Sequence, residues 1–207
     1  MLHRLAELDT RVRAGYAAYD FQGVFRALFD FATGDLSAFY FDIRKDALYC
    51  DAPTSPRRRA ARTVLDALFQ RLTLWLAPIL PFTAEDVWLS RHPSDEDSVH
   101  LHDFPETPAE WLNPALAAKW DGVRRARRVV TAALELRRAD KTIGASLEAA
   151  PVVHVEDAAT LAALRSVDFA AVCITSDVGL SGDPAPSEAF RLPEVPGMVV
   201  GAHDHPA

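Results

Sequence analysis

Apolar residues recur at helical spacing along most of the first 140 positions. In the first segment they are Leu2, Leu5, Leu8 and Val12, with charged residues between them. This is the pattern of an amphipathic helix. The same three- and four-residue steps continue in later segments and stop where proline, glycine or a polar pair occurs. The pattern predicts helices at residues 2–18, 21–48, 56–77, 83–90 and 114–139.

Local signals mark where several of these helices begin. Asp20 precedes the second apolar segment and has the side chain of a helix cap. Thr83 followed by Asp86 has the spacing of a capping box. Asn113 and Pro114 combine a cap with a proline at the first helical position. Each signal agrees with the helix starts that the apolar spacing predicts.

The helix predicted at 21–48 carries one continuous apolar stripe. Its members are Phe21, Val24, Phe25, Leu28, Ala32, Leu36, Phe39 and Ile43. Such a stripe predicts the face that a helical bundle buries. Tyr40, Asp42 and Lys45 lie off the stripe, so we expect them on the outer surface, where they could face a ligand.

The pattern changes after Gly144. Short runs rich in β-branched residues predict strands at 151–156, 171–176, 188–192 and 198–200. Between the first two runs, a helix capped by Asp157 is predicted to Arg165. The fold class is therefore mainly α: a helical-bundle domain at 1–141, followed by a small α+β module at 142–207.

Composition narrows the class of protein. The chain has 207 residues, of which 49% are hydrophobic, and this suits one large or two small globular domains. No apolar run reaches the roughly 18–20 residues that a bilayer crossing needs, and no secretory signal is visible. Cys50 and Cys173 lie far apart and form no CxxC pair. We expect a cytoplasmic protein with reduced thiols and no membrane partner.

Charge is distributed unevenly along the chain. The net charge is −7, yet residues 44–62 hold six basic side chains against two acidic ones. Residues 121–141 hold seven against three, whereas residues 151–207 hold two against eight. Local basic patches attract a phosphate backbone whatever the total charge, and the planar fork of arginine suits phosphate oxygens. An arginine run is also commonly a solvated helix face, so charge alone leaves both interpretations open.

The sequence shows no catalytic or metal constellation. Neither a GxxxxGK[ST] nor a GxGxxG phosphate loop occurs. His100 and His102 stand beside acidic residues, but two ligands are too few for a structural zinc site. We therefore expect no catalytic residues, no metal site and no cofactor in this chain.

Several motifs together resemble the anticodon-binding region of class I aminoacyl-tRNA synthetases of the bacterial isoleucyl type. They are Asp-Leu-Ser at 35–37, the Lys45-Asp46 pair, the turn from Ser55 to Arg58-Arg59, LAPILPFTAEDVW at 76–88 and ADKTIGASLEA at 139–149. The similarity covers most of residues 1–150 and is looser from 151 onward. Ala47 departs from the arginine that is more usual there, which weakens any contact inferred at that position.

The resemblance implies a chain that binds the anticodon limb of tRNA. It would do so as part of a ligase that attaches isoleucine to its tRNA. The catalytic signatures His-x-Gly-His and Lys-Met-Ser-Lys-Ser are absent, so we expect a C-terminal portion that is not catalytic alone. ATP with Mg would act in the rest of the synthetase chain. Zinc would belong to a further C-terminal module. The implied partners are tRNA and the rest of that chain.

Two basic strips are the candidate tRNA-binding residues. They are Arg44, Lys45, Arg57, Arg58, Arg59 and Arg62 in the first strip, and Arg124, Arg125, Arg127, Arg128 and Lys141 in the second. Two alternatives stay open: the equivalent domain of a valyl, leucyl or methionyl synthetase, and a helical protein-interaction module. The first shares the bundle and its Pro-Phe-Thr-Ala-like break, and the second accounts equally well for an acidic helical protein.

Overall fold

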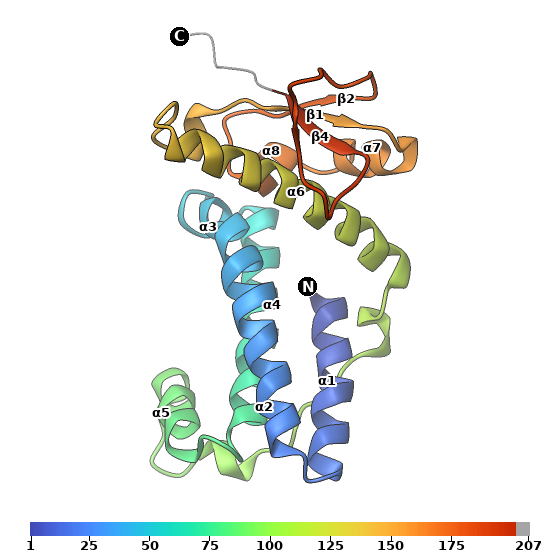
Figure 1. The fold of residues 1–207 in the computed structure, drawn as a ribbon. Coiled ribbons are helices and arrows are strands. Elements are labelled where there is room, and N and C mark those ends of the chain that lie inside the picture. The colour runs from blue at the N-terminus through green and yellow to red at the C-terminus, as the bar shows by residue number, and fades with distance from the viewer. Residues whose placement is uncertain (202–207) are drawn as a thin grey trace. The chain divides into compact units, whose positions relative to one another are not determined.

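A computed structural model describes residues 1–201. Its contacts divide the chain into two compact units, Met1–Asn113 (unit 1) and Pro114–Ala207 (unit 2), each of which is described by itself (Figure 1). Helices dominate, and the described part of the chain contains one four-stranded sheet, in unit 2. The prediction of a mainly α protein with a small α+β portion is confirmed.

Unit 1 is a helical bundle. Its elements are α1 (Leu2–Ala17), α2 (Phe21–Asp30), the π-helix η1 (Phe31–Phe41), α3 (Asp42–Tyr49), α4 (Pro56–Leu76), α5 (Pro81–Arg91), and the short 3-10 helices η2 (Val99–Leu101) and η3 (Ala109–Trp111). α2, η1 and α3 follow one another without a break and form one long helical run (Figure 1). The helices predicted at 2–18, 21–48 and 56–77 are therefore confirmed, with a π-helix inside the second.

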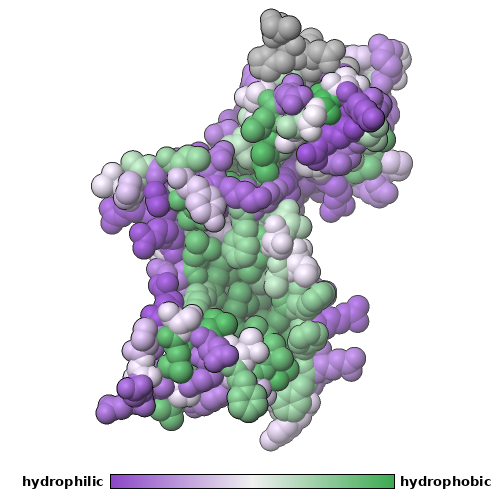
Figure 2. Space-filling view, turned by 90° about the vertical axis from the view of Figure 1, so that its left-hand side faces the viewer, coloured by the Kyte–Doolittle hydropathy of each residue, from purple (hydrophilic) through white to green (hydrophobic). Residues whose placement is uncertain are grey.

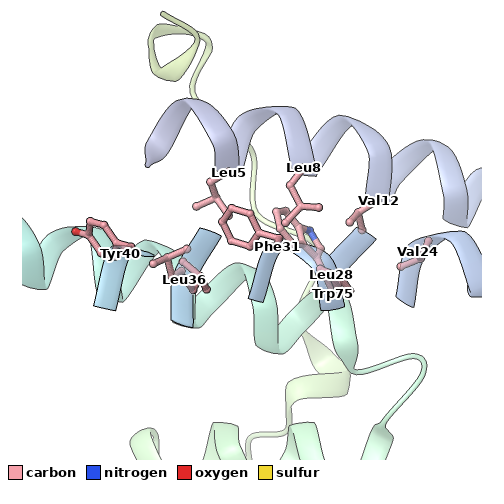
Figure 3. Close-up of a cluster of buried hydrophobic side chains, with 10 residues drawn as sticks. Leu5, Leu8, Val12, Val24, Leu28, Phe31, Leu36, Tyr40 and Trp75 are labelled. Atoms are coloured by element: carbon pink, nitrogen blue, oxygen red, sulfur yellow. The ribbon is translucent and has the colours of Figure 1, made fainter. Parts of the chain in front are cut away.

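The core of unit 1 lies between α1, the α2–η1 run and α4. Figure 3 shows Leu5 and Leu8 of α1 pointing toward Phe31 and Trp75. Trp75, from α4, has no exposed surface. The phenol of Tyr16 donates a hydrogen bond to the Trp75 backbone carbonyl, and burial raises the pKa of Tyr16 to about 12. Trp75 therefore joins α4 to α1, through its packing and through the bond from Tyr16.

The π-helix changes which positions face the core. A π-helix bonds residue i to i+5 and has more residues per turn than an α-helix, so the stripe drifts. Phe31 and Tyr40 are buried, whereas Ala32 is exposed. The predictions of Ala32 in the core and Tyr40 on the outer surface are therefore wrong. Arg4 of α1 fixes this segment by donating to Asp35 at 3.2 Å.

The outer side of α2 stays partly open to solvent. Phe21 and Phe25 are about half exposed, although they belong to the predicted stripe, because the bundle covers only the side that carries Val24 and Leu28. The Phe25 and Phe29 rings stack on each other at a centroid distance of 6.0 Å. Figure 2 shows hydrophobic side chains gathered on one face of this helical bundle.

α5 begins earlier than the sequence signal predicted. Its first residue is Pro81, its N-cap is Leu80, and no side chain caps it. Thr83 and Asp86 are exposed within the helix, so the predicted capping box is wrong. Proline at the first position sets the start instead, because its missing N–H is not needed there.

A buried arginine holds the connection that follows α5. Arg71 of α4 is only 5% exposed. It donates to the Glu106 carbonyl at 2.7 Å and to the Thr107 hydroxyl at 3.2 Å, and its guanidinium lies 4.4 Å from the centre of the Trp111 ring. Residues 91–112 were predicted to be mostly loop, and Arg71 holds the part from Glu106 to Trp111 against α4.

Unit 2 packs helices on a small mixed sheet. Its elements are α6 (Pro114–Ala139), η4 (Ser146–Glu148), β1 (Val152–Val155), α7 (Ala158–Arg165), α8 (Phe169–Cys173), β2 (Gly179–Ser181), β3 (Phe190–Arg191) and β4 (Met198–Gly201). The strand order is β2-β1-β4-β3, with β1 and β2 parallel and the other pairs antiparallel. α6 packs against β4, α7 and α8.

Most element predictions in unit 2 hold. α6, β1, β3 and β4 lie where they were predicted, and Asp157 caps α7 by accepting from the Thr160 amide at 2.7 Å. The strand predicted at 171–176 is wrong, since α8 occupies its first half. Asp168 caps that helix, and Ile174 ends it in the left-handed conformation at φ 59°. β2 was not predicted.

The contact-based units divide the chain between Asn113 and Pro114, not between 141 and 142. α6 carries a continuous buried face that includes Val123, Ala126 and Val130, and this helix packs on the elements of unit 2. The domain boundary predicted at 141/142 rests on family resemblance and on the change from helical to strand-like sequence patterns, and it stays a prediction.

Candidate nucleic-acid interface

The first basic strip surrounds the turn between α3 and α4. α3 ends at Tyr49, and α4 starts at Pro56 with Ser55 before it. α3 packs on α4, so Arg44 and Lys45 lie at the same end of the bundle as the arginines of the first turns of α4. The α4 N-terminus adds the partial positive charge of the helix dipole. The structure thus brings the six predicted residues of the first strip to one end of unit 1.

Asp51 organises the arginines of this turn. Its carboxylate accepts two hydrogen bonds from Arg57, each at 3.0 Å, and one from the Ser55 hydroxyl, also at 3.0 Å. Arg58 donates to the Asp51 backbone carbonyl at 2.7 Å. The hydrogen bond from Arg57 lowers the pKa of Asp51. A residue that the charge count treated only as a negative charge therefore sets the geometry of two arginines.

The remaining members of the first strip differ in their surroundings. The Arg44 guanidinium lies 5.8 Å from the centre of the Tyr40 ring. Lys45 donates to Asp42 at 2.9 Å. Arg59 and Arg62 are exposed on α4, three residues apart, and so share one side of the helix. Both side chains are therefore accessible to a ligand from solvent.

The second strip is divided between packing and surface. Arg127 donates from Nε to the Val172 carbonyl at 2.9 Å, which joins α6 to α8. Arg125 and Arg128 are exposed, whereas Arg124 is half-buried. Lys141 is exposed just after α6, with a φ of 62°. The structure therefore assigns Arg127 a packing contact within unit 2, and it brings the strip together less completely than the first.

Sequence reasoning missed two residues of the α3–α4 turn. Asp51 lies six residues before Arg57, but a sequence pattern does not distinguish this carboxylate from the others in the chain. Tyr49, the last residue of α3, is 82% exposed. It lies off the apolar stripe, which ends at Ile43, and that spacing was the available signal.

Neither a metal-binding cluster nor a candidate membrane-spanning helix occurs within residues 1–201. Within residues 1–201, no group of three or more His, Cys, Asp or Glu side chains is arranged to hold a metal ion. His102 contacts Asp97 at 2.8 Å, and the absence of a metal site stays a prediction. None of the helices between residues 1 and 201 combines the length and the apolar character that a membrane crossing requires.

Comparison with known proteins identifies the family. The anticodon-binding domain of tRNA ligases matches residues 1–154. The chain is 66% identical over 200 residues to isoleucine–tRNA ligase of Ruegeria pomeroyi, 60% identical to that of Agrobacterium fabrum and 50% identical to that of Bartonella henselae. Each match covers 97% of this chain and 20–21% of the relative, so the chain spans about a fifth of the length of these proteins. The chain therefore belongs to the family of anticodon-binding domains of tRNA ligases.

Proposed function

We propose that this chain recognises the anticodon limb of isoleucine tRNA as part of an isoleucine–tRNA ligase. The observation that carries the proposal is the cationic α3–α4 turn in a domain of the anticodon-binding family. Arginines held in a fixed orientation suit phosphate oxygens, and the single-stranded anticodon loop offers bases that a rigid surface can read. The relatives' names point to the isoleucine-specific enzyme rather than to its valyl, leucyl or methionyl counterparts.

The chemical steps of the ligase would take place outside these residues. ATP with Mg would activate isoleucine in a catalytic domain outside these residues, and zinc would bind in a further C-terminal module. The partners are tRNA and the rest of the ligase polypeptide, and the location is the cytoplasm. The role of the present residues is to position the tRNA by its anticodon limb.

Charge reversal at the α3–α4 end tests the proposal. The double variant R59E/R62E changes two exposed arginines of α4, and R11E/R26E changes two exposed arginines of α1 and α2 by the same net charge. We expect the first to weaken binding of isoleucine tRNA by roughly 10- to 100-fold at moderate salt, because phosphate contacts dominate affinity. The second should change it by less than about threefold. Equal losses would contradict a localised interface.

Competition between tRNA species tests the specificity. Labelled isoleucine tRNA is bound to the chain and displaced by unlabelled isoleucine or valine tRNA. We expect isoleucine tRNA to displace the label at lower concentration. No binding at low salt would refute the proposed function and would favour the protein-interaction alternative.

A further inference from the structure

Tyr49 is a solvent-exposed aromatic side chain on a rigid support. The other tyrosine of this helical run, Tyr40, is 6% exposed and packs in the core, whereas Tyr49 is 82% exposed. The amides of Cys50 and Asp51 both donate to the Asp46 carbonyl, at 2.8 and 3.2 Å, and so close the end of α3. The backbone that carries the ring is therefore fixed, while most of the side chain faces water.

The surroundings of Tyr49 distinguish it from an ordinary surface aromatic residue, which needs no explanation by itself. Two residues further on, the Asp51 carboxylate holds Arg57, and its carbonyl accepts from Arg58. α4 begins at Pro56, so a long helix presents its N-terminus at the same turn. An aromatic face and oriented cations occur together here.

This combination matches the chemistry of unpaired nucleic acid. Proteins bind single strands with cationic side chains along the backbone and aromatic side chains on which bases stack. Bases inside a duplex stack on each other and offer no free face, whereas loop bases can be splayed onto a protein ring. An exposed tyrosine two residues before the aspartate that orients Arg57 and Arg58 therefore suits a loop nucleotide better than a helical stem.

We propose that Tyr49 is the stacking platform for an unpaired base of the tRNA anticodon loop. The arginines of the α3–α4 turn contact phosphates of the same loop. This inference rests on the proposed function and adds a base-contacting residue to it. It also separates two roles at the turn: Tyr49 contributes through its aromatic face, and Arg59 and Arg62 contribute through charge.

The test compares substitutions at two equally exposed tyrosines. Tyr49→Ala removes the ring, while Tyr49→Phe and Tyr49→Trp keep an aromatic face. Tyr19→Ala is the matched control, because Tyr19 is 81% exposed but lies at the α1–α2 turn, at the opposite end of the α2–η1–α3 run (Figure 1). The probes are an isoleucine tRNA transcript, its anticodon stem-loop and a duplex of the same stem without a loop.

We expect Tyr49→Ala to weaken binding of the stem-loop by roughly 5- to 150-fold, as loss of one base–aromatic stack predicts. The Phe and Trp variants should stay within about threefold of the parent chain. Binding of the loop-free duplex should not change. The salt dependence of tRNA binding should also be unaltered by Tyr49→Ala, because stacking releases no counterions, whereas loss of a phosphate contact flattens it.

The outcomes separate the inference from the function that underlies it. If the parent chain binds tRNA and Tyr49→Ala binds as tightly, the stacking role is wrong and the proposed function stands. Equal losses in Tyr49→Ala and Tyr19→Ala, or equal losses for stem-loop and duplex, would also overturn the stacking role. If the parent chain binds no tRNA at all, both proposals fail together.

Discussion

Two arginine-rich stretches of this chain have similar sequences and different structural surroundings. In unit 1, Arg57 to Arg62 lie in the first turns of α4, next to an exposed turn. In unit 2, Arg124 to Arg128 lie in the middle of α6, whose Val123, Ala126 and Val130 are buried. A run in the middle of a packed helix must place some of its members against neighbouring elements, because successive residues point around the axis. A run at a helix start has solvent on more sides.

The electrostatic consequence also differs. Cations at a helix N-terminus are unfavourable against the helix dipole, and Asp51 offsets this by accepting from Arg57 and Arg58. On α6, Arg127 instead satisfies the Val172 carbonyl. Counting charges along a chain cannot tell an arginine that is held for a ligand from one that holds the fold together.

The largest effect should come from an arginine outside both runs. Arg71→Ala removes the donors to Glu106 and Thr107 and the cation–π contact with Trp111. We expect the free energy of unfolding of unit 1 to fall by about 3 kcal/mol, measured by urea denaturation followed by tryptophan fluorescence. Arg62→Ala, on the exposed side of α4, should stay within about 0.5 kcal/mol of the parent. If Arg71→Ala lowers the free energy of unfolding no more than Arg62→Ala does, the contacts of Arg71 do not stabilise unit 1.

The next effect sharpens the contrast inside α6. Arg127→Ala leaves the Val172 carbonyl without this donor, and we expect unit 2 to lose about 2 kcal/mol of stability. Hydrogen exchange of the α8 amides should accelerate correspondingly. The neighbouring variant Arg128→Ala changes an exposed side chain and serves as the control. Unchanged α8 protection in Arg127→Ala would show that the contact contributes nothing.

Most helices followed from the sequence because their signals are local. α1, α4 and α6 each have a long apolar repeat, and Asp157 caps α7 through a bond to an amide three residues away. The π-helix could not be predicted from spacing, because apolar residues at steps of three and four are also what an uninterrupted α-helix shows. The wider turn of the π-helix rotates the buried face, so Tyr40 is buried and Ala32 is exposed.

The errors arose where tertiary contacts decide. Residues 171–176 have the composition of a strand, yet Phe169, Val172 and Cys173 are buried on α8. Burial also raises the pKa of the Cys173 thiol to about 12. The candidate site was predictable as a basic region, but its arrangement was not. The Arg127 bond spans 45 residues, and no linear pattern indicates a partner at that distance.

A smaller effect should appear in tRNA binding and can reverse the comparison. R59Q/R62Q and R125Q/R128Q each remove two exposed positive charges. We expect the first pair to flatten the slope of log affinity against log salt by about 1.4, or about 0.7 for each lost phosphate contact. The second pair should have less than half that effect. A larger change from R125Q/R128Q would make α6 the main tRNA contact and contradict the assignment to the α3–α4 turn.

The smallest effect concerns pH at the α3–α4 turn. Hydrogen bonding from Arg57 lowers the pKa of Asp51 below its usual 3.8, so the unfolded chain binds a proton at higher pH than the folded one. The contribution of this contact is therefore present in full above about pH 4 and is lost as the pH falls through the lowered folded value. NMR titration of the Asp51 carboxyl and the Arg57 Nε–H should show this change.

Asp51→Asn supplies the control, because it removes the titrating group. Asp97, Asp140 and Asp157 also have lowered pKa values, from hydrogen bonds with Trp88, Thr142 and Thr160. The parent and Asp51→Asn should therefore both lose stability in acid. Only the parent should show an Arg57 Nε–H signal that moves between neutral pH and pH 3. If that signal moves in both proteins, Asp51 does not hold Arg57, and the α3–α4 turn does not differ from α6 by an oriented arginine.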